Sequence, residues 1–284
     1  MKRLSIALLA LSALAVATPQ AGSLLRRTLK ADTVDTYTIV DRTTQTVKSP
    51  LGEMPVTASS TRTLALTTKS VDAAAGTATI EATTTFDKME ADGPAADLMK
   101  SKPGPLTQKG KIDVRGRMTF ERVAQPGGIG TLLSGSESTL AAGSLVEFPE
   151  KPVQVGDSWD MIVPKSPMLS DVDQKLTAKL TGEKDLDGVP VWVVSVRGVV
   201  KTAMDSSKIP GAKPIQSALG PSTIRITGQD DITGEGLVEK STGRTLSMVL
   251  KAQSKKTIEI VESGITMDST GQLESTITLK KPAP

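Results

Sequence analysis

The sequence predicts an all-β, mainly antiparallel protein: a curved sheet or half-barrel with one or two short helices. Three observations predict this class. Apolar and polar residues alternate with a period of two from Asp32 to the C-terminus, threonine recurs at the polar positions, and short glycine-containing links separate the runs. One apolar face and one polar face is typical of an antiparallel sheet that is covered on a single side.

The alternating runs define the expected strands. Their apolar positions are Leu64 and Leu66; Ala78, Ile80, Ala82 and Phe86; Leu176, Ala178 and Leu180; Leu246, Met248, Leu250 and Ala252; Leu273, Ile277 and Leu279. Residues 189–196 differ, because they are apolar at both alternating positions and include Trp192. We expect that strand to be central and covered on both faces.

Four links end in glycine and predict hairpin turns, since glycine supplies the positive φ that such turns need: residues 72–76, 185–188, 241–243 and 268–271. Residues 94–106 and 206–221 instead contain several prolines and glycines. We expect loops with a short helix there. Loops of this length are usually functional or mobile.

The two halves of the chain resemble each other in outline. Residues 35–40 (DTYTIV) are echoed by residues 157–163 (DSWDMIV), and each half continues with a hairpin and a further long strand, near residues 111–123 and 245–253. This pattern predicts two similar β units, residues 22–145 and 146–284, packed as one globular body. The alternative, that any two β meanders share this outline, stays open.

The N-terminus predicts export. Met1-Lys2-Arg3 is followed by an apolar run to Ala17, with small residues at its end, as in a secretory signal peptide. We expect residues 1–21 to be removed, by cleavage after Ala17 or Ala21. The run is shorter than the ~20 residues that a transmembrane anchor needs, so the mature chain is expected to be soluble, in the periplasm or secreted.

Composition argues against several functions. Of 34 basic residues, Lys2 and Arg3 leave with the signal peptide, so 32 face 31 acidic ones, and aromatics make up 2% of the chain. Nucleic acid is therefore not an expected partner. With no histidine and no cysteine, a Ser-His-Asp triad, a Cys-His pair and ordinary zinc or copper sites are impossible. We expect no catalytic residues, no metal and no cofactor.

The densest acidic cluster is Asp230-Asp231, with Glu235 and Glu239 nearby. Paired carboxylates can act as general acid and base or bind calcium. The glycines between them favour a simpler interpretation, a strand–turn–strand with solvated acids. Asp185 and Asp187 resemble the start of a calcium loop but lack its later ligands, so a hairpin is expected. The glycine-rich residues 127–130 predict a flexible turn, because they fit no phosphate-binding pattern.

Residues 148–159 (FPEKPVQVGDSW) are the most distinctive string. The prolines favour an extended chain, Gly156-Asp157 favours a turn, and Trp159 is expected to begin a strand with its ring buried. The K-P-V-x-V-G-D-x-W pattern resembles exported bacterial β-rich proteins of unknown function. That resemblance implies no enzyme activity. It implies a fold similar to the half-barrel of periplasmic lipoprotein carriers.

The leading functional hypothesis is an exported, non-catalytic protein that binds or carries an apolar molecule or a partner segment in the cell envelope. One-sided apolar strands must be covered, and curved sheets often enclose ligands. A structural or envelope-associated protein that docks through exposed sheet edges is the alternative. A hydrolase that depends on the carboxylates of Asp230, Asp231 and Glu235 is the third hypothesis.

Overall fold

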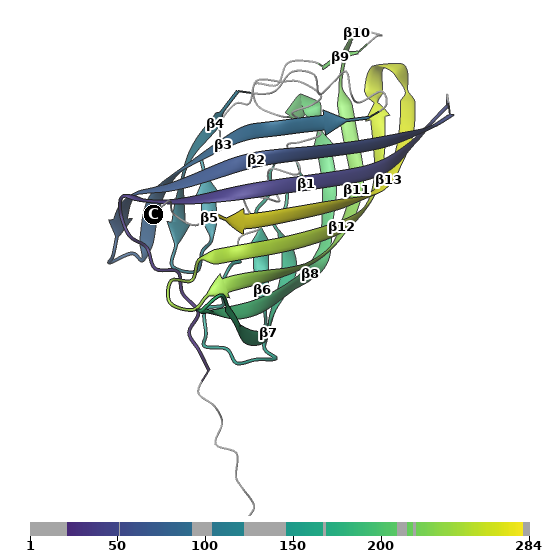
Figure 1. Ribbon diagram of the computed structural model, residues 1–284. Helices are drawn as coiled ribbons and strands as arrows, with labels where there is room; N and C mark the ends of the chain where they lie inside the picture. The colour runs from purple at the N-terminus through teal and green to yellow at the C-terminus, as the bar shows by residue number, and fades with distance from the viewer. Residues whose placement is uncertain are drawn as a thin grey trace, which may run out of the picture.

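The computed structural model describes residues 22–50, 52–92, 104–121, 146–166, 169–208, 215–217 and 220–280. Most of the described residues lie in one curved sheet of 11 antiparallel strands (Figure 1). The predicted fold class is therefore confirmed. The predicted signal peptide, residues 1–21, lies outside the described residues and stays a prediction.

The strands follow the alternating runs of the sequence. The first group comprises β1 (Thr33–Ser49), β2 (Gly52–Asp72), β3 (Thr77–Ala91), β4 (Leu106–Asp113) and β5 (Met118–Phe120). The second comprises β6 (Ser158–Val163), β7 (Gln174–Leu186), β8 (Val189–Asp205), β11 (Ile224–Glu239), β12 (Thr245–Ile260) and β13 (Ile265–Leu279). A separate two-stranded sheet contains β9 (Ile215–Ser217) and β10 (Gly220–Ser222).

The strand order is β5-β4-β3-β2-β1-β13-β12-β11-β8-β7-β6. The strands of residues 22–145 thus form one side of the sheet and those of residues 146–284 the other, joined where β1 pairs with β13. Within the sheet, β3-β2-β1 and β8-β7-β6 have the same order and sense, as a repeat requires. The internal repeat remains a prediction.

The sheet curls around a single hydrophobic core, so its concave face is the buried one. That core unites Ile112 of β4, close to one edge, with Trp159 and Met161 of β6 at the other edge. Side chains nine positions apart in the strand order can share a core only if the sheet bends back on itself. The prediction of a half-barrel is confirmed.

Glycines at inward positions allow this bending. A Cβ atom on Gly234 would lie 2.5 Å from Leu250 Cδ2 and 2.7 Å from the Val249 carbonyl oxygen on β12. Glycine within a strand often marks such a close approach of two backbones. β11 runs without a break through residues 228–236, so the strand–turn–strand predicted there is wrong.

The N-terminal segment from Gly22 to Lys30, here called the N-terminal strap, lies across one end of the half-barrel (Figure 1). Its backbone N–H groups at Ser23, Arg27 and Thr28 donate to the carbonyl oxygens of Val153 (2.7 Å), Val114 (2.7 Å) and Thr242 (2.8 Å). Leu25 is fully buried in the core. The strap thus ties together three segments far apart in the sequence, and this end is called the strap end below.

Three of the four predicted turns are confirmed. Residues 73–76 connect β2 to β3, residues 187–188 connect β7 to β8, and residues 240–244 connect β11 to β12. Asp187 and Gly188 both have positive φ (52° and 83°), and the Gly188 N–H donates to Asp185 Oδ1, as in a tight two-residue hairpin.

The fourth predicted turn, residues 268–271, is wrong, because these residues lie inside β13. The chain instead turns at the 3-10 helix η3 (Val261–Ser263) and Gly264. Gly271 serves close packing, since a Cβ there would lie 2.8 Å from the Cα of Gln45 on β1.

Other expectations need smaller corrections. The single long strand predicted near residues 111–123 is two short strands, β4 and β5, which turn at Val114–Arg117. The expected loop at residues 206–221 begins with the 3-10 helix η2 (Ser206–Lys208) and contains the β9–β10 hairpin. Most of the expected loop at residues 94–106 lies outside the described residues.

The strand with Trp192 is β8, which lies between β11 and β7. Val191 and Trp192 are neighbours on opposite faces, and both are buried. Coverage of both faces does not extend along the strand, because Val199 is exposed.

Candidate binding face

The concave face of the half-barrel changes from apolar to polar along its strands. Four strands show the change, going away from the strap end: β2 (Leu66 and Leu64, then Arg62 and Ser60), β1 (Tyr37 and Ile39, then Asp41 and Thr43), β12 (Met248 and Ala252, then Ser254 and Lys256) and β11 (Val238 and Ile232, then Asp230). The registers place the polar positions of β1 beside those of β2 and the polar positions of β11 beside those of β12. On β13, between these two pairs of strands, Ser275 is followed by the apolar Leu273, which lies opposite Thr43. An apolar zone and a polar band thus lie on one surface, and Leu273 interrupts the band.

The polar band consists of side chains that are largely removed from water. Its members are Asp41, Thr43, Arg62, Thr202, Asp230, Ser254, Lys256, Ser269 and Ser275. Buried charged residues are rare in proteins unless they are paired. The charges of the band therefore need partners within it.

Two ion pairs hold the charges of the band. Arg62 Nη2 lies 3.0 Å from Asp41 Oδ2, with side-chain exposures of 3% and 4%. Lys256 Nζ lies 3.0 Å from Asp230 Oδ2, with exposures of 19% and 6%. Each pair joins two neighbouring strands, and the band has no net charge from these four groups.

The Asp41–Arg62 pair is extended by hydroxyl groups. Ser60 Oγ donates a hydrogen bond of 3.2 Å to Asp41 Oδ2. On the other side of β1, Ser275 of β13 is directly opposite Asp41 in the register. Three adjacent strands thus contribute polar groups to one place on the concave face.

Among the polar atoms of the concave face that are buried without a hydrogen-bond partner in the described residues are Ser275 Oγ, Thr202 Oγ1 and Trp192 Nε1. Native structures contain few such atoms, because each one gives up its hydrogen bond to water. Each of the three therefore presents an unused hydrogen-bonding group on the concave face.

Non-strand residues fill the concave face at the strap end. Val146, Phe148 and Val153 join Leu25 in the core. Val146 lies against β11, because a Cβ on Gly236 would approach its Cγ2 atom to 3.1 Å. Nearby, burial raises the pKa of the Tyr37 phenol, opposed by the charge of Arg27.

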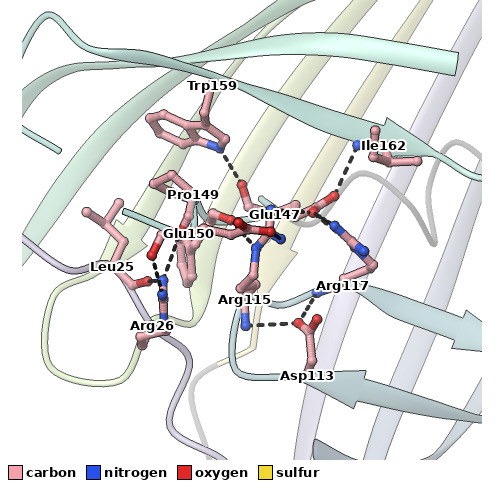
Figure 2. A network of polar contacts seen from close by, with 11 residues as sticks. Leu25, Arg26, Asp113, Arg115, Arg117, Glu147, Pro149, Glu150, Trp159 and Ile162 are labelled. Carbon is pink, nitrogen blue, oxygen red and sulfur yellow. Dashed lines mark hydrogen bonds and ion pairs between the residues drawn. The ribbon is translucent and has the colours of Figure 1, made fainter. Parts of the chain in front are cut away.

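Glu147 connects the residues that fill the strap end to both edges of the sheet through its buried carboxylate and its backbone carbonyl group (Figure 2). Glu147 Oε1 accepts hydrogen bonds from Arg115 Nη2 (2.9 Å) and Arg117 Nη2 (2.7 Å), at the β4–β5 turn. Its Oε2 accepts the Ile162 N–H of β6 (3.0 Å), and its backbone carbonyl oxygen accepts Trp159 Nε1–H (2.6 Å). The hydrogen bond that Arg117 donates to Glu147 raises the pKa of the Arg117 guanidinium above its usual value.

The FPEKPVQVGDSW string therefore acts structurally. Trp159 lies in β6 with its ring buried, and Gly156 has a φ of 106° in the turn before it. Arg26 of the strap donates to the carbonyl oxygens of Pro149 (2.6 Å) and Glu150 (2.8 Å). The expected turn and buried ring are confirmed.

The predicted acidic cluster does not form a site. Asp230 points into the concave face, whereas Asp231 and Glu235 are exposed on the convex face. Glu239 lies at the strap end of β11, where it binds Thr242 and Arg244. The strand period of two separates these carboxylates, so they cannot work as a pair.

No other predicted site gains support. Across the part of the chain that the structure describes, no group of three or more acidic residues is placed to hold a metal ion. Asp185 and Asp187 belong to the β7–β8 hairpin. Residues 127–130 lie outside the described residues.

Asp41, Arg62 and Ser275 were not predicted as site residues from the sequence. A signal for the first was present, because Asp41 continues the two-residue spacing of Tyr37 and Ile39 and so falls on the apolar face. A charge in phase with apolar positions indicates either the end of the core or a buried functional group.

Comparisons with known proteins identify no family. No protein-family profile and no curated protein matches the chain. Among the solved structures that align with it is DynF from the dynemicin biosynthesis pathway of Micromonospora chersina, with 10% identity, coverage of 94% of this chain and 88% of that chain, and a TM-score of 0.26. A DUF1329 family protein from Desulfovibrio piger aligns with 8% identity, coverage of 87% of each chain and a TM-score of 0.16. A third structure, a putative outer membrane lipoprotein-sorting protein domain from Vibrio parahaemolyticus, aligns with 8% identity, coverage of 87% of each chain and a TM-score of 0.14. The third is of the kind that the K-P-V-x-V-G-D-x-W resemblance implied. At these TM-scores none of the three supports an inference about this chain.

A search of the described residues for membrane-spanning helices found none of the required length and hydrophobicity.

Proposed function

We propose that this protein is an exported, non-catalytic carrier that binds an amphipathic, mainly apolar molecule against the concave face of its half-barrel. The observation that carries the proposal is the change from an apolar zone to a buried polar band on one continuous surface. Such a surface matches a ligand with an apolar body and a polar end.

The energetics support this interpretation. A buried ion pair such as Asp41–Arg62 is often less stabilising than well-packed apolar residues of similar volume. Its retention inside the half-barrel, next to the Ser275 hydroxyl that has no partner in the described residues, is understandable if these groups serve binding.

The alternative function, docking through sheet edges, has less support. The edge strands are short, with three residues in β5 and six in β6. Glu147 also occupies the Ile162 N–H, which points away from β7 and would otherwise be available to a docking strand. Short and capped edges are how proteins avoid strand addition.

Native mass spectrometry of protein purified from its own host tests the carrier. We expect an adduct of lipid-like mass that organic extraction releases, and binding of the fluorescent apolar probe N-phenyl-1-naphthylamine after extraction. Protein that carries no adduct and does not bind the probe would contradict the proposal.

A further inference from the structure

The surroundings of Ser275 define the polar end of the molecule that this half-barrel binds. Ser275 is 6% exposed, faces the concave side of β13 and lies opposite Asp41 in the register. Its Oγ atom has no hydrogen-bond partner within the described parts of the chain. A hydroxyl group can both donate and accept a hydrogen bond, so it can serve many polar head groups.

The charges beside Ser275 restrict what that head group can be. Asp41 lies on β1, the strand next to β13, where it is paired with Arg62 and accepts a hydrogen bond from Ser60, both on the following strand β2. The pair is 3–4% exposed, and its two charges cancel. A ligand with a net charge would have no counter-charge there, and burying an unpaired charge is strongly unfavourable.

The second ion pair leads to the same restriction. Lys256 and Asp230 also cancel, and they lie farther from the strap end than Asp41 and Ser275. The apolar residues Ile39 and Ile277 lie on the other side of Asp41 and Ser275, one inward position closer to the strap end. The head group is therefore flanked by an apolar zone for its chain and by a band without net charge.

We propose that Ser275, with the Asp41–Arg62 pair, forms a head-group subsite for a single-chain amphiphile with a net-neutral, hydrogen-bonding head. This inference rests on the proposed carrier function and names its ligand class. Both an uncharged polyol ester and a zwitterionic head have this chemistry.

Displacement of N-phenyl-1-naphthylamine by four amphiphiles of equal chain length tests the inference. They are a monoacylglycerol (uncharged), a lysophosphatidylcholine (zwitterionic), a lysophosphatidylglycerol (anionic) and an alkyltrimethylammonium (cationic). We expect the two net-neutral probes to bind at least ten-fold more tightly than the two charged ones. Whichever of the two net-neutral probes binds more tightly identifies the kind of neutral head group that the protein takes. Equal affinity for the anionic or cationic probe would overturn the inference.

The variant Ser275→Ala tests the residue. We expect it to weaken binding of the better neutral probe about five-fold, the effect of one hydrogen bond, and to leave the affinity for the headless fluorescent probe unchanged. Thr278→Ala is the matched control, because Thr278 is exposed on the opposite face of the same strand. Equal binding by both variants would refute the role of Ser275. If the native protein binds no probe at all, the carrier function itself fails.

Discussion

Replacing Glu147 by leucine is expected to lower the free energy of unfolding by about 3 kcal/mol. The carboxylate is 5% exposed and accepts hydrogen bonds from two arginines and one edge-strand N–H. Breaking a buried ion pair by removing one partner usually costs about 3–5 kcal/mol. We expect the lower end here, because Arg115 keeps Glu150 at 2.8 Å and Arg117 is 39% exposed, so water solvates it.

Urea denaturation followed by the fluorescence of Trp159 and Trp192 measures this change. Glu150→Leu is the control, since the Glu150 side chain is 78% exposed and forms its ion pair with Arg115, so we expect a loss below about 1 kcal/mol. Hydrogen exchange at the Ile162 amide should also accelerate in the Glu147 variant. Equal losses for the two variants, or an unchanged Ile162 amide, would refute the idea that Glu147 joins the two edges of the sheet.

Three further changes test other parts of the structure. Burial opposes ionisation of Glu239, but hydrogen bonds from Thr242, Arg244 and Ser241 outweigh it and lower its pKa below the usual 4.5. The stability from Glu239 is therefore present above pH 4.5 and lost as pH falls further, so Glu239→Gln should destabilise the protein less at pH 3 than at pH 7 in urea titrations. Thr202→Val removes a buried hydroxyl that has no partner in the described structure, so we expect the free energy of unfolding to rise by about 1 kcal/mol. Thr233→Val, on the exposed face of β11, is the control and should leave the free energy of unfolding unchanged. Gly234→Ala should lower the free energy of unfolding by about 1–3 kcal/mol, because the new Cβ atom clashes with β12. Gly182→Ala, whose Cβ atom meets no atom within 4 Å, should not lower it, and chemical denaturation measures both variants.

Local sequence pattern located most of the long strands of this fold. Alternation of apolar residues located the long strands, and Asp187-Gly188 predicted a hairpin because two positive φ angles are required there. The same logic failed at residues 268–271 and 228–236. Glycine in a sequence signals either a turn or a close approach of two strands, and only the register of the neighbouring strand distinguishes them.

The candidate binding face could not be derived in the same way. Asp41, Arg62 and Ser275 are separated by up to 234 positions in the chain and meet only because β1 pairs with both β2 and β13. The contacts of Glu147 also depend on strand pairing, since its partners Arg115 and Ile162 lie near opposite edges of the sheet. Period-two patterns report which face a side chain occupies, but not which strand lies beside it.

The places where a sequence departs from what stability favours are informative about function. The concave face could have been apolar throughout, as its strap end is, and the contacts of Glu147 would then have joined the two edges of the sheet around a purely apolar core. Instead, Asp41 and Ser275 introduce a charge and an unused hydroxyl one inward position beyond Ile39 and Ile277, and Arg62 introduces a second charge directly opposite Ile39. Natural proteins tolerate such losses of stability where activity depends on them. The polar band of the concave face, more than any single exposed residue, is therefore where binding specificity should be sought.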